Sequence, residues 1–141
     1  MKIHIDIETF SPVDLKASGL YKYVADPAFE IILLSYAIGE DPVRTVDLAQ
    51  GEPYPEEFLK AYFHAEKHAH NAAFERIALG KVLGETPIQD WHCSMAKCAY
   101  AGIQLSLDKA SKMLGINASK MVDVGKDCIR YFSNPCKPKK T

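Results

Sequence analysis

Lys2-Ile3-His4-Ile5-Asp6-Ile7-Glu8-Thr9, at the start of the chain, is the stretch that decides the fold. Apolar and polar residues alternate through it, which is the period of a β-strand with one buried face. The isoleucines lie on one face of such a strand, and Asp6 and Glu8 point together from the other. At the usual strand rise the two acids are about 6–7 Å apart. Carboxylates held this close repel each other unless a cation or a proton lies between them.

A divalent metal site would explain this pair of acids. Mg²⁺ prefers a few carboxylates, together with water and phosphate oxygens, to a cage made entirely of protein ligands. The alternative is an edge strand whose polar face is simply solvated. The strand by itself does not distinguish these two interpretations, and other segments of the chain are needed to do so.

Length and composition indicate one globular domain. The chain has 141 residues, of which 48% are apolar and 25% charged, and its formal net charge is −1. This size allows one hydrophobic core, and the near-neutral charge excludes a global basic field for nucleic acid, so any such contact is local. No membrane span or secretory signal is visible. We therefore expect a cytoplasmic protein with no membrane partner and with its four cysteines reduced.

The order of the predicted elements favours a mixed sheet flanked by helices. Strands are predicted at 2–8, 29–38, 43–48 and 67–70, and short turns make the first three an antiparallel meander. Helices are predicted after Pro55, from an Asn71 cap to Gly84, from a Ser94 cap to Tyr100, from a Ser106 cap to Gly115, and over 122–132. Inward-facing residues are expected to include Phe63, Val82, Leu107, Ala110 and Leu114.

A second chemical candidate is the segment His70-Asn71-Ala72-Ala73-Phe74-Glu75. Asn71 and Glu75 are four residues apart, so both lie on the same side of the first turn of a helix. A structural interpretation competes with a functional one, because Asn71 can cap the helix and Glu75 favours the positive end of its dipole. The presence of the Asp6 and Glu8 pair elsewhere in the chain favours the functional one.

Together these two segments resemble the first two motifs of the DEDD 3′–5′ exonucleases. More narrowly, the chain is similar to the exonuclease region of phage-encoded family A DNA polymerases. The matching stretches are Asp6-Ile7-Glu8-Thr9-Phe10-Ser11, Gly19-Leu20-Tyr21-Lys22-Tyr23, His70 to Arg76, Trp91 and Leu105 to Ala110. The resemblance covers nearly the whole chain. It implies an α/β, ribonuclease H-like fold, in which three antiparallel strands and at least one parallel strand form a mixed sheet flanked by helices.

The resemblance also implies a metal-dependent reaction on the 3′ end of single-stranded DNA. Two Mg²⁺ or Mn²⁺ ions would activate a water and stabilise the charge on the leaving oxygen of the scissile phosphate. Asp6 would bridge both ions, Glu8 would bind one and help to orient the water, and Glu75 would hold the other. Many of these exonucleases carry Asp in the second motif, so Glu75 departs from the wider pattern, although the phage group accepts Glu.

Three further residues would contact the nucleic acid: Thr9, Phe10 and Asn71. Phe10 would stack on a terminal base, since aromatic faces stack bases without sequence preference. A core position just after the strand explains Phe10 equally well. Asn71 would orient its own segment or a nucleotide.

The fourth acid of the family is missing from this chain. It belongs to a third motif, a Tyr or His followed by Asp on a late helix, but no acid follows Tyr131, and Asp123 and Asp127 lack a suitably placed Tyr or His. We therefore expect residues 1–134 to be a domain that stops before the third motif, and 135–141 to be a basic tail. Alone it should have little or no exonuclease activity. The alternative is a non-catalytic remnant that binds nucleic acid or a polymerase domain or subunit.

Two histidine patterns offer weaker metal sites. His64, His68 and His70 surround Glu66, but they are divided between a predicted helix and a predicted strand and need not converge. His92-Cys93 with Cys98 matches no ordinary zinc-finger spacing. We interpret both groups as structural.

Overall fold

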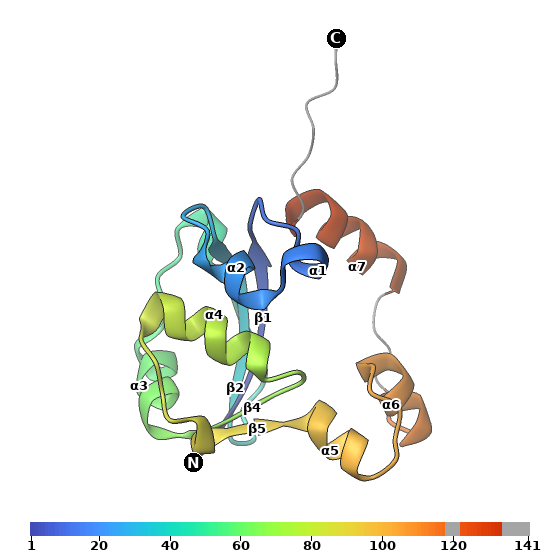
Figure 1. The fold of residues 1–141 in the computed structure, drawn as a ribbon. Helices are drawn as coiled ribbons and strands as arrows, with labels where there is room; N and C mark the ends of the chain where they lie inside the picture. The colour runs from blue at the N-terminus through green and yellow to red at the C-terminus, as the bar shows by residue number, and fades with distance from the viewer. Residues whose placement is uncertain (118–121, 134–141) are drawn as a thin grey trace.

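The computed structural model describes residues 1–117 and 122–133, and it contains a five-stranded sheet (Figure 1). β1 (Lys2–Phe10) is the central strand. β2 (Glu30–Ile38) and β3 (Arg44–Asp47) form with it the predicted antiparallel meander. β4 (Glu66–Ala69) is parallel to β1, and β5 (Trp91–Cys93) is parallel to β4. The order across the sheet is therefore β3-β2-β1-β4-β5.

The alternation of β1 divides the sheet into an apolar face and a polar face. The apolar face is covered by α3 (Glu56–His64) and α4 (Ala73–Leu83). Members of this core include Ile3, Ile5, Ile7, Phe58, Tyr62, Ala78 and Leu79. Phe63 and Val82 were predicted to face inward, but they are 44% and 45% exposed. Phe63 follows the buried Tyr62 directly and so points away from the stripe, and Val82 stands in the last turn of α4.

Two short helices between β1 and β2 are not predicted from the sequence. α1 (Leu15–Ser18) begins after Asp14, whose carboxylate accepts hydrogen bonds from two backbone amides of the first turn. Gly19, with φ of +82°, separates it from α2 (Leu20–Ala25). α2 buries Tyr23 and packs against α4. Helices of four and six residues are too short to show a hydrophobic period, which is why the pattern missed them.

The later helices follow the predicted order. They are α5 (Ser94–Tyr100), α6 (Leu107–Met113) and α7 (Val122–Cys128), which continues into the π-helical turn η3 (Ile129–Ser133). Figure 1 shows α5 and α6 apart from α3 and α4, on the other side of the view. α7 lies near the end of β1, and η3 contacts that strand.

The predicted helix caps are right at one position and wrong at another. Ser106 caps α6, since its hydroxyl accepts a hydrogen bond from the Lys109 amide. Ser94 does not cap α5; the cap is Cys93, and Ser94 is the first helical residue. In α6, Ala110 is buried as predicted, whereas Leu107 and Leu114 are 52% and 55% exposed. α6 is thus anchored by a small residue.

Two 3₁₀ turns, η1 (Leu48–Gln50) and η2 (Ile88–Asp90), complete the described elements. Across residues 1–117 and 122–133, no helix combines the length and the apolar composition needed to cross a membrane. In the same ranges Cys93, Cys98 and Cys128 are free thiols. Cys136 and the basic tail 135–141 lie outside the described residues.

Candidate functional site

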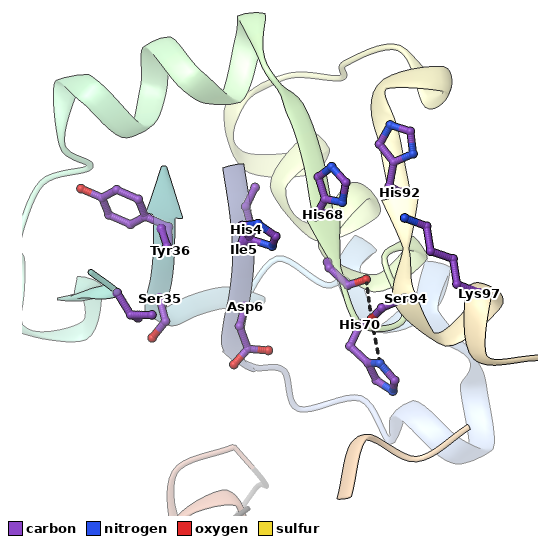
Figure 2. Close-up of a pocket in the computed structure, with 13 residues that line it drawn as sticks. His4, Ile5, Asp6, Ser35, Tyr36, His68, His70, His92, Ser94 and Lys97 are labelled. Atoms are coloured by element: carbon purple, nitrogen blue, oxygen red, sulfur yellow. Dashed lines mark hydrogen bonds between the residues drawn. The ribbon is translucent and has the colours of Figure 1, made fainter. Parts of the chain in front are cut away.

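Asp6 and Glu8 leave β1 on the polar face of the sheet, as their spacing predicts. Asp6 lies opposite Ser35 of β2 and is exposed; Glu8 lies opposite Leu33 and is half-buried. The pairing register shifts between Glu8 and Thr9, so the strand is irregular directly after the second acid. Figure 2 shows the Asp6 carboxylate projecting from β1 on the side where His70 lies.

Glu75 stands in the first turn of α4, on the stripe of that helix that is otherwise apolar. It shares the stripe with Ala78 and Leu79, three and four positions later, and is only 4% exposed. One carboxylate oxygen, Oε2, is buried without a hydrogen-bond partner among the described residues. A glutamate in this position is costly unless something else satisfies its charge.

Asp6 and Glu8 lie near enough to Glu75 for their charges to influence its pKa. Burial is the main cause that raises it, and the negative charges of Asp6, Cys93 and Glu8 add to the effect, bringing the pKa to about 8. The fold therefore brings together the three carboxyl groups that the sequence singled out, although β1 and α4 are distant in the chain.

This donor set fits a divalent cation. Carboxylate oxygens are the ligands that Mg²⁺ and Mn²⁺ prefer. A cation placed among Asp6, Glu8 and Glu75 would compensate their mutual repulsion, and it would give the unsatisfied Glu75 oxygen a partner. The observation that supports the fit is this orphaned oxygen, since a structural glutamate ordinarily finds a hydrogen-bond donor.

Asn71 does not cap α4, contrary to the sequence-based prediction. Its φ is +67°, in the left-handed region that Asn tolerates better than most residues. Ala72 is the cap residue and makes no side-chain cap hydrogen bond. The Asn71 carbonyl accepts a hydrogen bond from the Phe74 amide, which closes the tight turn into the helix, and the residue itself is exposed. A contact between Asn71 and nucleic acid stays a prediction.

Thr9 is a structural tie between β1 and α2. It is 5% exposed, and its Oγ1 lies 3.0 Å from the hydroxyl oxygen of Tyr23. Burial raises the pKa of Tyr23, and the negative charge of Glu8 acts in the same direction. Phe10 is half-buried at the end of β1, opposite Glu30. Neither position tests the predicted contacts with nucleic acid.

A pocket of about 720 Å³ lies beside Glu8. Its walls combine apolar, aromatic and charged side chains from β1, α1, α2, α4 and η3. Residues that line it include Ile7, Glu8, Thr9, Lys16, Tyr23, Phe74 and Ile129. Tyr23 and Lys16 were not identified as candidate site residues from the sequence, because α1 and α2 were not predicted. The resemblance at Gly19 to Tyr23 was the signal that could have drawn attention to this segment.

A second pocket, of about 280 Å³, is lined by Asp6 and by His4, His68, His70 and His92 (Figure 2). At its floor His70 links three segments: its Nε2 is 2.8 Å from the Leu105 carbonyl oxygen, and its Nδ1 is 2.9 Å from Ser94 Oγ. Because a carbonyl oxygen only accepts, Nε2 carries the proton. The Ser94 hydroxyl lies between His70 Nδ1 and the Ala69 carbonyl oxygen, to which it donates over 3.5 Å. His70 thus joins the end of β4 to α5 and to the loop before α6.

The histidines group differently from the pattern in the sequence. His64 is exposed at the end of α3, and His70 is engaged by Ser94 and Leu105. The ligand atoms that the structure brings together are instead those of Glu66, His68 and His92. His92 joins this group only because β5 pairs with β4, and a three-residue strand gives no periodic signal.

The described part of the C-terminal region reaches the same end of the sheet. Ile129 and Ser133 of η3 line the pocket beside Glu8. Tyr131 is 73% exposed, and its ring meets that of Phe132 edge to face at 5.0 Å. No acid occurs in η3, so within residues 1–117 and 122–133 the candidate site comprises the three acids described above.

Comparisons with known proteins agree with the resemblance seen in the sequence. No protein-family model matches the chain. The chain is 45% identical, over 142 residues, to a DNA polymerase of Bacillus phage SP02. This alignment covers 98% of the chain and 22% of the polymerase, so the chain spans about a fifth of the length of that relative. The predicted similarity to a phage DNA polymerase is thereby confirmed.

Solved structures of nucleases share the fold. One, a nuclease in its apo form, matches with a TM-score of 0.58 and 17% identity, over 85% of this chain and 55% of its own. NrnC of Brucella melitensis, alone and bound to pGG, matches with a TM-score of 0.57 and the same identity and coverage. With the mixed sheet already described, these matches confirm the ribonuclease H-like fold.

Proposed function

We propose that this chain is the metal-dependent 3′–5′ exonuclease module of a phage-like DNA polymerase, acting on the 3′ end of single-stranded DNA. The observation that carries the proposal is the buried Glu75 carboxyl group held near Asp6 and Glu8, with one oxygen unsatisfied. The similarity to a phage polymerase and the fold shared with nucleases support it. A polymerase domain or subunit would be the partner of such a module.

In this proposal, the three acids together would bind two divalent ions. Asp6 would bridge them, Glu8 would bind one and orient the attacking water, and Glu75 would hold the other. When bound, Mg²⁺ or Mn²⁺ supplies positive charge to the scissile phosphate and makes a nearby water more acidic. Glu75 would bind such a cation as a carboxylate and would therefore have to release its proton. Its burial keeps this carboxylate oriented and away from bulk water.

The pocket beside Glu8 is the proposed seat of the terminal nucleotide. Its volume of about 720 Å³ accommodates a nucleotide, and Tyr23 and Phe74 add aromatic surface to its wall. Lys16, in the same wall, provides a positive charge for a phosphate. This local cation suits a chain whose formal net charge is only −1.

Metal binding in the presence of a nucleotide tests the proposal. The 141-residue chain is titrated with Mn²⁺, with and without dTMP, and free Mn²⁺ is followed by electron paramagnetic resonance. We expect dTMP-dependent binding that weakens at least about tenfold in Glu75→Gln, which is about 1.4 kcal/mol. Glu40→Gln, on an exposed turn, is the matched control and should leave binding unchanged.

Hydrolysis is measured in parallel on a 3′-labelled single strand. Because the sequence supplies only three acids of the four-acid pattern, we expect slow Mn²⁺-dependent trimming that Asp6→Asn abolishes. If the wild-type chain binds Mn²⁺ no better than Glu75→Gln, the proposal fails and the non-catalytic alternative takes its place.

A further inference from the structure

We propose a second metal site, formed by Glu66, His68 and His92, that takes a borderline divalent cation of the Zn²⁺ class. One ligand atom from each residue lies within 4.8 Å of the other two. The set is separate from the carboxylates Asp6, Glu8 and Glu75, and the inference does not depend on the exonuclease proposal. Two imidazoles and one carboxylate are a recurrent zinc ligand set, whereas Mg²⁺ prefers oxygen ligands alone.

Strand register brings these residues together. His4 of β1 pairs with His68 of β4, and His68 pairs with His92 of β5. The three rings therefore form a row across three neighbouring strands on the polar face of the sheet (Figure 2). Ring centroids are 5.2 Å apart between His4 and His68 and 4.7 Å between His68 and His92. Glu66, two positions before His68, projects from the same face.

The interatomic distances are close to those of a bound site. Glu66 Oε2 is 3.8 Å from His68 Nε2 and 4.0 Å from His92 Nε2. With ligand bonds of about 2.0–2.2 Å, neighbouring ligand atoms of a tetrahedral zinc are separated by roughly 3.3–3.5 Å. Closing the difference requires a shift of about half an ångström. Glu66 can supply it for its own two distances by rotating, since its side chain is 54% exposed, and the two imidazoles, whose ligand atoms lie within 4.8 Å of each other, would also have to move closer.

His68 lacks a partner that its environment would lead us to expect. Its Nε2 is buried and has no hydrogen bond to any described residue. A neutral imidazole nitrogen can donate its lone pair to a metal. A cation bound at His68 Nε2 would give this atom the partner that it lacks.

A metal at this position would fasten the edge of the sheet. β5 has only three residues, and α5 starts directly after it. Joining His92 to Glu66 and His68 would hold β5 against β4. It would also steady Ser94, whose hydroxyl hydrogen-bonds with His70. Three protein ligands leave a fourth position for water, which would open into the pocket of about 280 Å³.

Cobalt substitution tests this site on the full chain. Co²⁺ is titrated into the metal-free protein, and visible absorption is recorded together with the thermal unfolding midpoint. We expect one equivalent with a tetrahedral or five-coordinate spectrum that Zn²⁺ displaces, in addition to any octahedral Co²⁺ held by the three acids, and a rise in the midpoint. His92→Ala should weaken binding at least about tenfold. His64→Ala is the matched control, because it removes an exposed histidine elsewhere and should leave binding intact.

Two further measurements distinguish binding at this site from binding at Asp6 or at Cys93. Asp6→Asn should keep the Co²⁺ spectrum, because Asp6 is not a ligand. A thiolate charge-transfer band should be absent, because Cys93 follows His92 and points to the opposite face of β5. The proposal is overturned if no tetrahedral or five-coordinate Co²⁺ is found, if His64→Ala and His92→Ala lose binding equally, or if a thiolate band appears. Circular dichroism of His92→Ala establishes that the variant is folded.

Discussion

At the scale of single residues, the Glu75 carboxyl group couples folding to protonation. Burial, and then the charges of Asp6, Cys93 and Glu8, raise its pKa from 4.5 to about 8. The folded state therefore holds this proton more tightly than the unfolded state does. The resulting stability is fully present below about pH 4.5 and is lost as pH rises through about 8.

Without metal, the chain should accordingly lose stability between pH 5.5 and pH 8.5. We expect a loss of about 3 kcal/mol from this group. Glu75→Gln, which cannot ionise, should lack this part of the pH dependence. Urea unfolding in the presence of a chelator measures the free energy of unfolding at both pH values. Equal pH dependence in the two proteins would contradict the assignment.

Metal binding should release the proton that Glu75 holds. At pH 7 the group is mostly protonated in the folded chain, so binding of Mn²⁺ should expel close to one proton. Calorimetric titration in two buffers of different ionisation enthalpy counts the protons released. The number should fall towards zero at pH 9.5, where Glu75 is already ionised. A count that does not change with pH would argue against Glu75 as a ligand.

At the scale of elements, a buried lysine links β4 to the turn before β5. Lys67 is fully buried, and its Nζ has no hydrogen-bond partner among the described residues. The nearest opposite charge is Asp90 in η2, whose Oδ2 is 3.6 Å away, and the Tyr62 ring lies 5.9 Å from the ammonium. Such a pair contributes little net stability, but it is costly to break on one side.

Substitutions on the two sides of this pair should therefore differ. Lys67→Met keeps the volume and removes the buried charge, so we expect a change of less than about 1 kcal/mol in the free energy of unfolding. Asp90→Asn leaves the ammonium uncompensated and should cost about 2–3 kcal/mol, somewhat less than for a fully buried pair because Asp90 is partly exposed. Denaturant unfolding of both variants decides the matter. A larger loss in Lys67→Met would show that the pair is net stabilising.

The elements that the sequence predicts well are those with a long hydrophobic period. The alternation in β1 and the apolar run in β2 place both strands correctly. The pattern misses β5, α1 and α2, which are too short for any period to show. The cap at Asn71 is wrong for another reason. Asn also tolerates a positive φ, and here the backbone turn uses that property instead of the side chain.

At the scale of the whole molecule, the candidate site lies where the sheet changes direction. β1 has an antiparallel neighbour on one side and a parallel neighbour on the other. The acids occupy the later half of β1 and the first turn of α4, which follows β4. Ligand sites in open α/β sheets tend to form outside the carboxyl ends of the strands, and Asp6 and Glu8 lie towards that end of β1. The sequence predicts the three acids from their spacing and the family resemblance, but not Tyr23 or Lys16, which reach the pocket through unpredicted helices.

The position of β1 also determines when the site can form during folding. Its pairing with β2 joins positions from Phe10 and Glu30 to Ile3 and Ile38, whereas its pairing with β4 joins Lys2 to Glu66 and closes a longer loop. Contacts between distant parts of the chain cost more loop-closure entropy and limit the folding rate. The pairing of β1 with β2 therefore positions Asp6 and Glu8 without Glu75, and the three carboxylates would come together only when α4 packs against the sheet. Both proposed metal sites would thus require the completed topology, and an ion bound by Glu66, His68 and His92 would slow unfolding by opposing the separation of β5 from β4.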